Sequence, residues 1–214
     1  MRLVLPRLYV ILDAALIPSP ERDCAASLAE AGVRLLQYRN KSASARQYLE
    51  GSRVLAELLC PRGVSFFVND RADVAFLAGA TGVHVGQEDL DAEQARRVAG
   101  VDKLVGVSTH NMEQFERAAV STADYIAVGP VYSTSTKANP DPVVGLDLLR
   151  RVRTLTEKPI VAIGGITLER AASTIEAGAD SVAVISGIWN APDPSERAGE
   201  YIKTLDAAKH AATV

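Results

Sequence analysis

Tyr125-Ile126-Ala127-Val128-Gly129-Pro130 is the stretch of this chain that most directly indicates its fold. Its apolar run has no polar alternation, which predicts a strand buried on both faces. The Gly-Pro pair ends that strand, because proline cannot donate to a sheet and glycine favours a turn. Strands of this kind are typical of parallel sheets covered by helices.

The same pattern recurs along the whole chain. Short apolar runs alternate with longer amphipathic stretches, so each strand is followed by a helix. We expect strands at residues 8–11, 33–38, 65–68, 83–85, 104–107, 125–128, 159–163 and 181–185. We expect helices to begin near Glu21, Ser44, Arg71, Asp91, Asn111, Gly145, Thr167 and Ser195. Ser44 and Asp91 each precede a glutamine by three residues, which is capping-box spacing.

Eight strand–helix units in 214 residues predict an α/β fold, a (β/α)₈ TIM barrel that occupies residues 1–214 as one catalytic domain. A doubly wound open sheet is the alternative. That fold requires a glycine-rich phosphate-binding turn after its first strand. Asp13-Ala14-Ala15-Leu16 stands there instead, so the barrel is favoured.

The composition is that of an ordinary soluble protein, with 48% hydrophobic residues and a net charge of −3. This mild acidity argues against nucleic acid or an anionic membrane as the main partner. Cys24 and Cys60 are isolated, which suits a reducing compartment. No apolar run approaches the ~20 residues of a membrane span. We expect a cytoplasmic protein acting on small molecules, and the sequence leaves open whether it forms a homo-oligomer.

Hydroxyl groups and glycines mark a predicted phosphate pocket. Ser133-Thr134-Ser135-Thr136-Lys137 follows the strand at 125–128, where hydroxyls and an ammonium group suit a phosphate. A solvated Ser/Thr loop is the alternative interpretation. Gly164-Gly165 and Ser186-Gly187 follow the last two strands, where barrels usually bind phosphate. Glycines let backbone N–H groups approach phosphate oxygens closely, so we predict a phosphomonoester site.

The other strand ends carry a mixture of cations and carboxylates. The four stretches are Gln37-Tyr38-Arg39-Asn40-Lys41, Asn69-Asp70, Gly86-Gln87-Glu88-Asp89 and Ser108-Thr109. A carboxylate ~4 Å from a diphosphate would be repelled by about 4 kcal/mol per charge pair. Carboxylates therefore suit this site only with a divalent cation between them and the ligand. Two aspartates, water and phosphate oxygens describe Mg²⁺, so we predict a Mg²⁺-diphosphate site opposite the monophosphate.

Several residues that often carry catalysis have other expected roles. No cysteine follows a predicted strand, which disfavours a thiolate nucleophile. His84 lies within a strand, which favours a role as a hydrogen-bonded core or lining residue. His110 lies near a helix start, where capping or a place on the rim is favoured. Metal-assisted departure of diphosphate needs no strong protein base, and the pattern agrees with that chemistry.

Seven short motifs resemble those of the thiamine phosphate synthase family, in the same order. They are Gln37-x-Arg39-x-Lys41, Asn69-Asp70, His84-Val85-Gly86-Gln87-x-Asp89, Gly106-x-Ser108-Thr109-His110, Gly129-Pro130 through Thr134-x-Thr136-Lys137, Ile163-Gly164-Gly165-Ile166 and Ile185-Ser186. The resemblance covers nearly the whole chain and implies a (β/α)₈ barrel.

The resemblance implies a transferase of thiamine biosynthesis. It would couple 4-amino-2-methyl-5-(diphosphooxymethyl)pyrimidine to 4-methyl-5-(2-phosphooxyethyl)thiazole by dissociative loss of diphosphate and capture by the thiazole nitrogen. The implied pyrimidine diphosphate ligands are Gln37, Tyr38, Arg39, Asn40, Lys41, Asn69, Ser108 and Lys137, with Lys137 and Ser108 catalytic. The implied thiazole phosphate ligands are Thr134, Ser135, Thr136, Gly165, Ile185 and Ser186. Asp70 and Asp89 would bind Mg²⁺.

Two other functions use parts of the same pattern. A thiazole tautomerase-like relative shares the barrel and the monophosphate pocket, but does not need Lys41, Asp70 and Asp89 together. A non-catalytic binder of phosphorylated thiazole or thiamine phosphate would not need the metal carboxylates. Gly187 stands where alanine is common in the family, and we expect no functional consequence of this departure.

Overall fold

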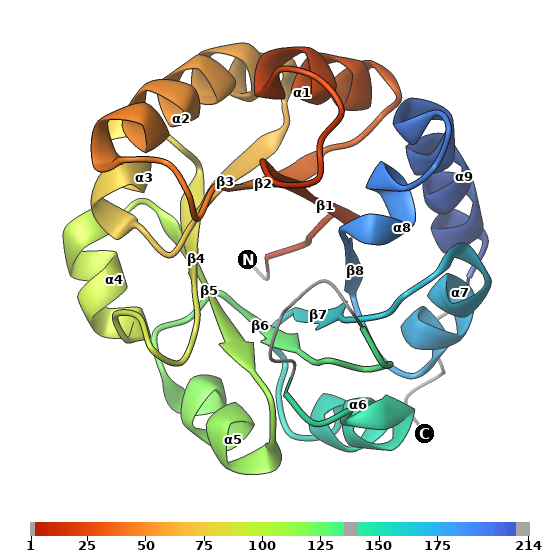
Figure 1. Cartoon of the computed structure of the whole chain (residues 1–214). Coiled ribbons are helices and arrows are strands. Elements are labelled where there is room, and N and C mark those ends of the chain that lie inside the picture. Colours follow the sequence, from red (N-terminus) through yellow and green to blue (C-terminus); the bar gives the residue numbers. More distant parts are fainter. Residues whose placement is uncertain (1–2, 135–140, 209–214) are drawn as a thin grey trace.

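Eight parallel strands close into a barrel in chain order, inside a ring of helices (Figure 1). The computed structural model describes residues 3–134 and 141–208. The strands are β1 Leu8–Asp13, β2 Leu35–Arg39, β3 Ser65–Asn69, β4 Gly82–Val85, β5 Leu104–Thr109, β6 Tyr125–Val128, β7 Ile160–Ile163 and β8 Ser181–Val184. Because β1 pairs with β8, the predicted (β/α)₈ barrel is confirmed and the open sheet is excluded.

The helices occupy the intervals expected from the amphipathic stretches. They are α1 Glu21–Glu30, α2 Ala45–Leu59, α3 Ala72–Ala78, α4 Ala92–Ala99, α5 Met112–Val120, α6 Gly145–Arg153, α7 Leu168–Glu176, α8 Ser186–Trp189 and α9 Pro194–Ala207, with a 3₁₀ turn η1 at Cys60–Arg62. Ser44 and Asp91 form complete capping boxes, and the Asn111 side chain caps α5. The capping predictions are therefore confirmed.

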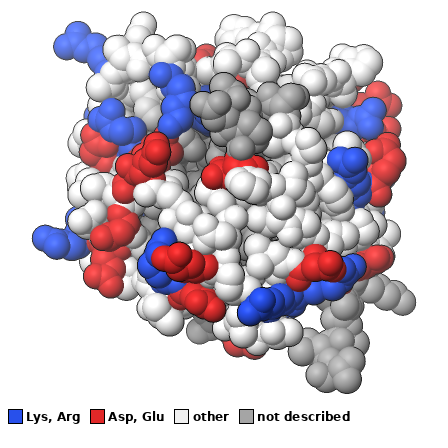
Figure 2. Space-filling view, turned by 60° about the horizontal axis from the view of Figure 1, so that its bottom comes forward, with Lys and Arg blue, Asp and Glu red and all other residues white. Residues whose placement is uncertain are grey.

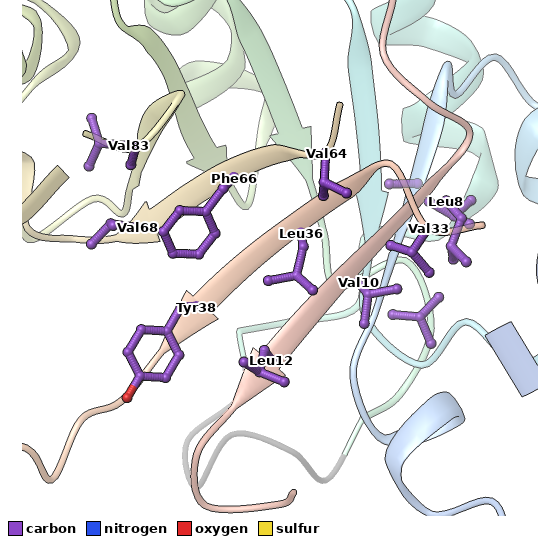
Figure 3. Close-up of a cluster of buried hydrophobic side chains, with 14 of the residues drawn as sticks. Leu8, Val10, Leu12, Val33, Leu36, Tyr38, Val64, Phe66, Val68 and Val83 are labelled. Atoms are coloured by element: carbon purple, nitrogen blue, oxygen red, sulfur yellow. The ribbon is translucent and has the colours of Figure 1, made fainter. Parts of the chain in front are cut away.

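Side chains of the strands alternate between two separate cores. The residues that face the helices include Val10, Leu36, Phe66 and Val68, which lie on one side of β1–β3 in Figure 3. The residues between them face the barrel interior, where Ile11, Leu35, Phe67, Tyr125, Val161 and Ala183 form a second cluster. This period of two means that only every second residue of a strand can reach the barrel mouth.

Three aromatic rings fill the middle of the barrel interior. The ring centroids of Tyr9, Phe67 and Tyr125 lie 5.6–6.1 Å apart, in tilted and edge-on arrangements. A Cβ atom at Gly106 would lie 2.0 Å from the Tyr125 ring, and one at Gly82 would lie 2.6 Å from the Phe67 ring. These two glycines on neighbouring strands therefore provide the space that the rings occupy.

Surface charges are mixed in sign. On the face drawn in Figure 2, lysine and arginine side chains are interspersed with aspartate and glutamate. In the described residues, none of the helices has both the length and the apolar character needed to cross a membrane. Cys24 and Cys60 are both free thiols.

Candidate active site

The inward-facing residue at the end of each strand reaches a common mouth. Gln37 and Arg39 are inward-facing positions of β2, and Ser108 holds the corresponding place on β5. Tyr48 of α2 ties the ends of β2 and β3 together: its hydroxyl donates to the Tyr38 carbonyl oxygen (2.9 Å) and accepts from the Asn69 N–H (3.2 Å). The strand ends that carry the predicted polar residues are thus held in fixed register.

Asp70 and Asp89, the predicted metal ligands, lie next to each other. Burial raises the pKa of Asp89; the Gly86 N–H opposes this rise, and a hydrogen bond and like charge from Asp70 add to it. The Gly86 N–H to Asp89 Oδ2 distance is 2.8 Å. Lys41 forms an ion pair with the Asp70 carboxylate.

The backbone of Asp70 is unusual. Its φ is +64°, the single positive value at a non-glycine residue among the described residues. Its N–H donates to the His84 carbonyl oxygen at 2.7 Å, which joins the end of β3 to β4. Aspartate tolerates this left-handed conformation better than most residues, and strained positions of this kind concentrate at functional sites.

A divalent cation fits these two carboxylates. Both offer hard oxygen ligands, and a cation between them would replace their mutual repulsion with attraction. Across residues 3–134 and 141–208, no group of three or more His, Cys, Asp or Glu side chains is placed to hold a metal ion. Two carboxylates leave coordination positions for water and diphosphate oxygens, as Mg²⁺ prefers.

Asp13 is a site residue that the sequence did not reveal. It is 3% exposed at the end of β1, and its carboxylate pairs with the Arg39 guanidinium. The Ala15 N–H donates to its other oxygen at 3.1 Å. Asp13 thereby orients Arg39 at the mouth. The strand β1 continues to Asp13, two residues after the inward-facing Ile11, so Asp13 also faces inward. This alternation is the signal by which the sequence could have revealed Asp13 as a site residue.

Tyr38 differs from the sequence-based expectation. It is 1% exposed among the outward-facing apolar residues (Figure 3), and its hydroxyl donates to Glu21 of α1. The Asn40 amide donates to the Tyr38 hydroxyl at 3.1 Å, and its carbonyl accepts from the Ser42 and Ala43 N–H groups. Tyr38 and Asn40 alternate along the chain with Gln37, Arg39 and Lys41. Their side chains therefore stabilise the turn that leads into α2.

The β7 and β8 ends form the opposite wall of the mouth. Gly164 and Gly165 have φ values of +100° and +63°. A Cβ atom at Gly165 would lie 2.3 Å from the Ser133 carbonyl oxygen, so this turn and the loop after β6 are in close backbone contact. Ser186 begins the short helix α8, and Ile185 is the residue that precedes it.

Two long-range hydrogen bonds hold this wall. Trp189 of α8 donates from Nε1 to the Ile11 carbonyl oxygen at 2.7 Å, and Tyr201 of α9 donates to the Ile166 carbonyl oxygen at 3.1 Å. A Cβ atom at Gly187 would lie 2.5 Å from the Tyr201 hydroxyl oxygen. Glycine at this position therefore makes room for the tyrosine.

The loop after β6 carries the remaining predicted site residues. Ser135, Thr136 and Lys137 lie outside the described residues. Thr134 is described and is partly buried. His110 holds the start of the same loop, because its Nδ1 donates to the Gly129 carbonyl oxygen at 2.6 Å, in agreement with the expected rim role.

Comparisons with known proteins agree with the resemblance noted from the motifs. A family model described as thiamine monophosphate synthase matches residues 8–188. The thiamine-phosphate synthase of Koribacter versatilis is 53% identical over 208 residues, which cover 95% of this chain and 97% of the relative. That of Agrobacterium fabrum is 40% identical over 210 residues, covering 94% of each.

A solved structure extends the similarity to the fold. The thiamine phosphate pyrophosphorylase from Pyrococcus furiosus matches with a TM-score of 0.85 at 34% identity, covering 94% of this chain and 96% of that one. Both the sequence matches and this structure span nearly the full barrel. The chain belongs to the thiamine monophosphate synthase family.

Proposed function

We propose that the protein condenses 4-amino-2-methyl-5-(diphosphooxymethyl)pyrimidine with 4-methyl-5-(2-phosphooxyethyl)thiazole, giving thiamine monophosphate and diphosphate. Family membership makes the chain an enzyme, a transferase of thiamine biosynthesis. The observation that carries the assignment of the site is the adjacency of Asp70 and Asp89 beside Lys41. A monophosphate pocket alone would not need this arrangement.

The wall formed by β2–β5 is the proposed site for the pyrimidine diphosphate. Arg39 and Lys41 supply positive charge for the phosphate oxygens, and the inward position of Arg39 is supported by its pairing with Asp13. Gln37, Asn69 and Ser108 offer amide and hydroxyl groups to the pyrimidine. By family resemblance Lys137 joins this set, and Lys137 and Ser108 are the proposed catalytic residues.

Asp70 and Asp89 would hold the Mg²⁺ ion. When bound, Mg²⁺ neutralises charge that develops on the departing diphosphate. Lys41 lies against Asp70, and in this proposal its ammonium group pairs with oxygens of the bound diphosphate. Leaving-group stabilisation of this kind is electrostatic and requires preorganised charges more than a strong base.

The β7–β8 wall is the proposed site for the thiazole phosphate. In this proposal backbone N–H groups of the left-handed turn at Gly164 and Gly165 bind the phosphate, because glycines carry no side chain that would block its approach. Ile185, Ser186, Thr134, Ser135 and Thr136 complete the set by family resemblance. With the two anions on opposite walls, the thiazole nitrogen can approach the pyrimidine methylene carbon between them and capture it after diphosphate leaves.

Small molecules are thus the proposed partners, in a cytoplasmic setting. The two free cysteines and the mixed surface charge support these proposals.

A coupled assay tests the function. The protein is incubated with both substrates, with and without Mg²⁺, and thiamine monophosphate and diphosphate are quantified. We expect equimolar products that depend on Mg²⁺. Binding of thiazole phosphate without condensation would indicate a tautomerase-like relative or a non-catalytic binder.

A further inference from the structure

A continuous line of hydrogen bonds crosses the barrel interior below the mouth. It runs from Gln37 Nε2 to the Tyr9 hydroxyl (2.9 Å), to the Tyr125 hydroxyl (3.0 Å), and to His84 Nδ1 (2.9 Å). His84 Nε2 then lies 2.8 Å from Ser108 Oγ. The line joins two proposed pyrimidine ligands on different strands through three residues that sequence reasoning did not assign to the site.

The members of this line are held rigidly. Tyr9 and Tyr125 are 1% and 0% exposed, and Gln37 is 2% exposed. The His84 ring stacks on Tyr125 at a centroid distance of 5.6 Å and an angle of 24°. Gly106 supplies the space for the Tyr125 ring. Burial also raises the pKa of both tyrosines, so each keeps its single proton at neutral pH.

The amide nitrogen of Gln37 sets the direction of the first bond, because it can only donate and the Tyr9 oxygen accepts from it. The proton arrangement that continues this polarity has Tyr9 giving its own proton to Tyr125. Tyr125 in turn gives its proton to His84 Nδ1. In this arrangement a neutral imidazole carries its one proton on Nε2, which points at Ser108 Oγ.

We propose that Tyr9, Tyr125 and His84 are positioning residues, which transmit the polarity of the Gln37 amide to Ser108 across the barrel. The Ser108 oxygen accepts from His84, so the serine presents its own proton to the mouth. Ser108 is thereby set as a hydrogen-bond donor toward an acceptor atom of the pyrimidine diphosphate. The proposal rests on the proposed function for the ligand, but the proton arrangement belongs to the protein itself.

The first test reads the histidine tautomer in the ligand-free protein. ¹⁵N-histidine labelling gives few signals, because the chain has three histidines, and a His110→Asn variant helps to assign His84. We expect a pyridine-like Nδ1 and a pyrrole-like Nε2 for His84 in the wild type. A proton on Nδ1, or on both nitrogens, would overturn the proposal.

The decisive variant is Tyr9→Phe, because Tyr9 is two hydrogen bonds away from His84. Phenylalanine keeps the ring packing but removes the hydroxyl that connects Gln37 to Tyr125, so both His84 nitrogen signals should move toward the average of the two tautomers. Thr174→Val in α7 is the matched control: it removes a buried hydroxyl that donates to the Arg170 carbonyl oxygen. It should leave His84 unchanged, and unchanged His84 signals in Tyr9→Phe would refute the proposal.

A double-mutant cycle then links the line to turnover. We expect Tyr9→Phe to lower kcat about tenfold in the wild type, the equivalent of about 1.4 kcal/mol, and to have no further effect in a Ser108→Ala background. An equal loss in both backgrounds would show that Tyr9 does not act through Ser108. If the wild type lacks synthase activity but shows the predicted tautomer, the proposed function fails and the proton arrangement stands.

Discussion

Asp70 combines a proposed metal ligand with a backbone conformation that few residues adopt. Its φ of +64° lies in the left-handed region, which costs most side chains about 1–2 kcal/mol, but aspartate and asparagine less. Two substitutions therefore separate the carboxylate from the backbone. Asparagine removes the charge and keeps the conformational tolerance, whereas alanine removes both.

We expect Asp70→Asn to change the free energy of unfolding by less than about 0.5 kcal/mol and to lower Mg²⁺-dependent turnover at least about tenfold. Asp70→Ala should lose the same activity and, in addition, about 1 kcal/mol of stability. Urea denaturation and steady-state kinetics measure the two effects. Asp73→Asn, which breaks an exposed pair with Arg71, is the control with normal turnover. Wild-type turnover in Asp70→Asn would remove Asp70 from the metal site.

At the scale of elements, the turn between β7 and α7 separates the two proposed pockets experimentally. Gly165 and Gly63 have similar φ values of +63° and +73°, so alanine strains both by roughly 1 kcal/mol. The Cβ atom would lie 2.3 Å from the Ser133 carbonyl oxygen at Gly165, and no atom lies within 4 Å at Gly63.

We therefore predict that Gly165→Ala raises the KM for thiazole phosphate about tenfold, a loss of about 1.4 kcal/mol of binding, and destabilises the fold more than Gly63→Ala does. The KM for the pyrimidine diphosphate should change little. Steady-state kinetics with each substrate varied in turn measures the split. A rise confined to the pyrimidine KM would mean that the two walls are assigned the wrong way round.

The order of the elements was predictable because it depends on local patterns. Apolar runs, the capping residues Ser44, Asp91 and Asn111, and the Gly-Pro stop at Gly129 are readable from neighbouring positions. The alternation within β2 was also readable, and applying it would have separated Tyr38 from Gln37 and Arg39. The ends of strands are harder to predict than their existence. The strand β1 extends two residues beyond the predicted end and includes Asp13.

The contacts across the barrel could not be predicted in the same way. Tyr9 and Tyr125 are 116 residues apart in sequence, and their hydroxyl groups meet because the closed barrel brings inward-facing residues of β1 and β6 together in its interior. The contact between His84 and Ser108 depends on the register of β4 against its neighbour β5. Sequence patterns identify such residues as buried strand positions, but their partners depend on the barrel geometry.

For the molecule as a whole, buried tyrosines predict loss of stability in alkali. Burial raises the pKa of Tyr38 and Tyr201 to about 12, and it also raises the pKa of Tyr9, Tyr48 and Tyr125. Unfolded tyrosine ionises near pH ~10. Below that pH the unfolded and folded chains hold the same phenol protons. Above it the unfolded chain loses them first, so stability falls as pH rises toward the folded values.

We expect the urea midpoint to fall steadily above about pH 10, with phenolate absorbance of these tyrosines appearing together with the loss of far-UV circular dichroism. Parallel absorbance and dichroism titrations check this coupling. Ionisation of all six tyrosines near the model-peptide pKa, while the dichroism stays native, would show that the interior hydroxyls are not protected by the fold.

The whole site depends on two anions being bound on opposite walls, one of them through a metal on Asp70 and Asp89. Crystals grown with Mn²⁺ in place of Mg²⁺, together with diphosphate and thiamine monophosphate, allow the metal to be located by anomalous scattering. We predict one strong peak within about 2.3 Å of a carboxylate oxygen of both Asp70 and Asp89, in contact with diphosphate, and the product phosphate beside Gly165 and Ser186. A metal peak elsewhere, or diphosphate beside Gly165, would contradict the proposed division of the site.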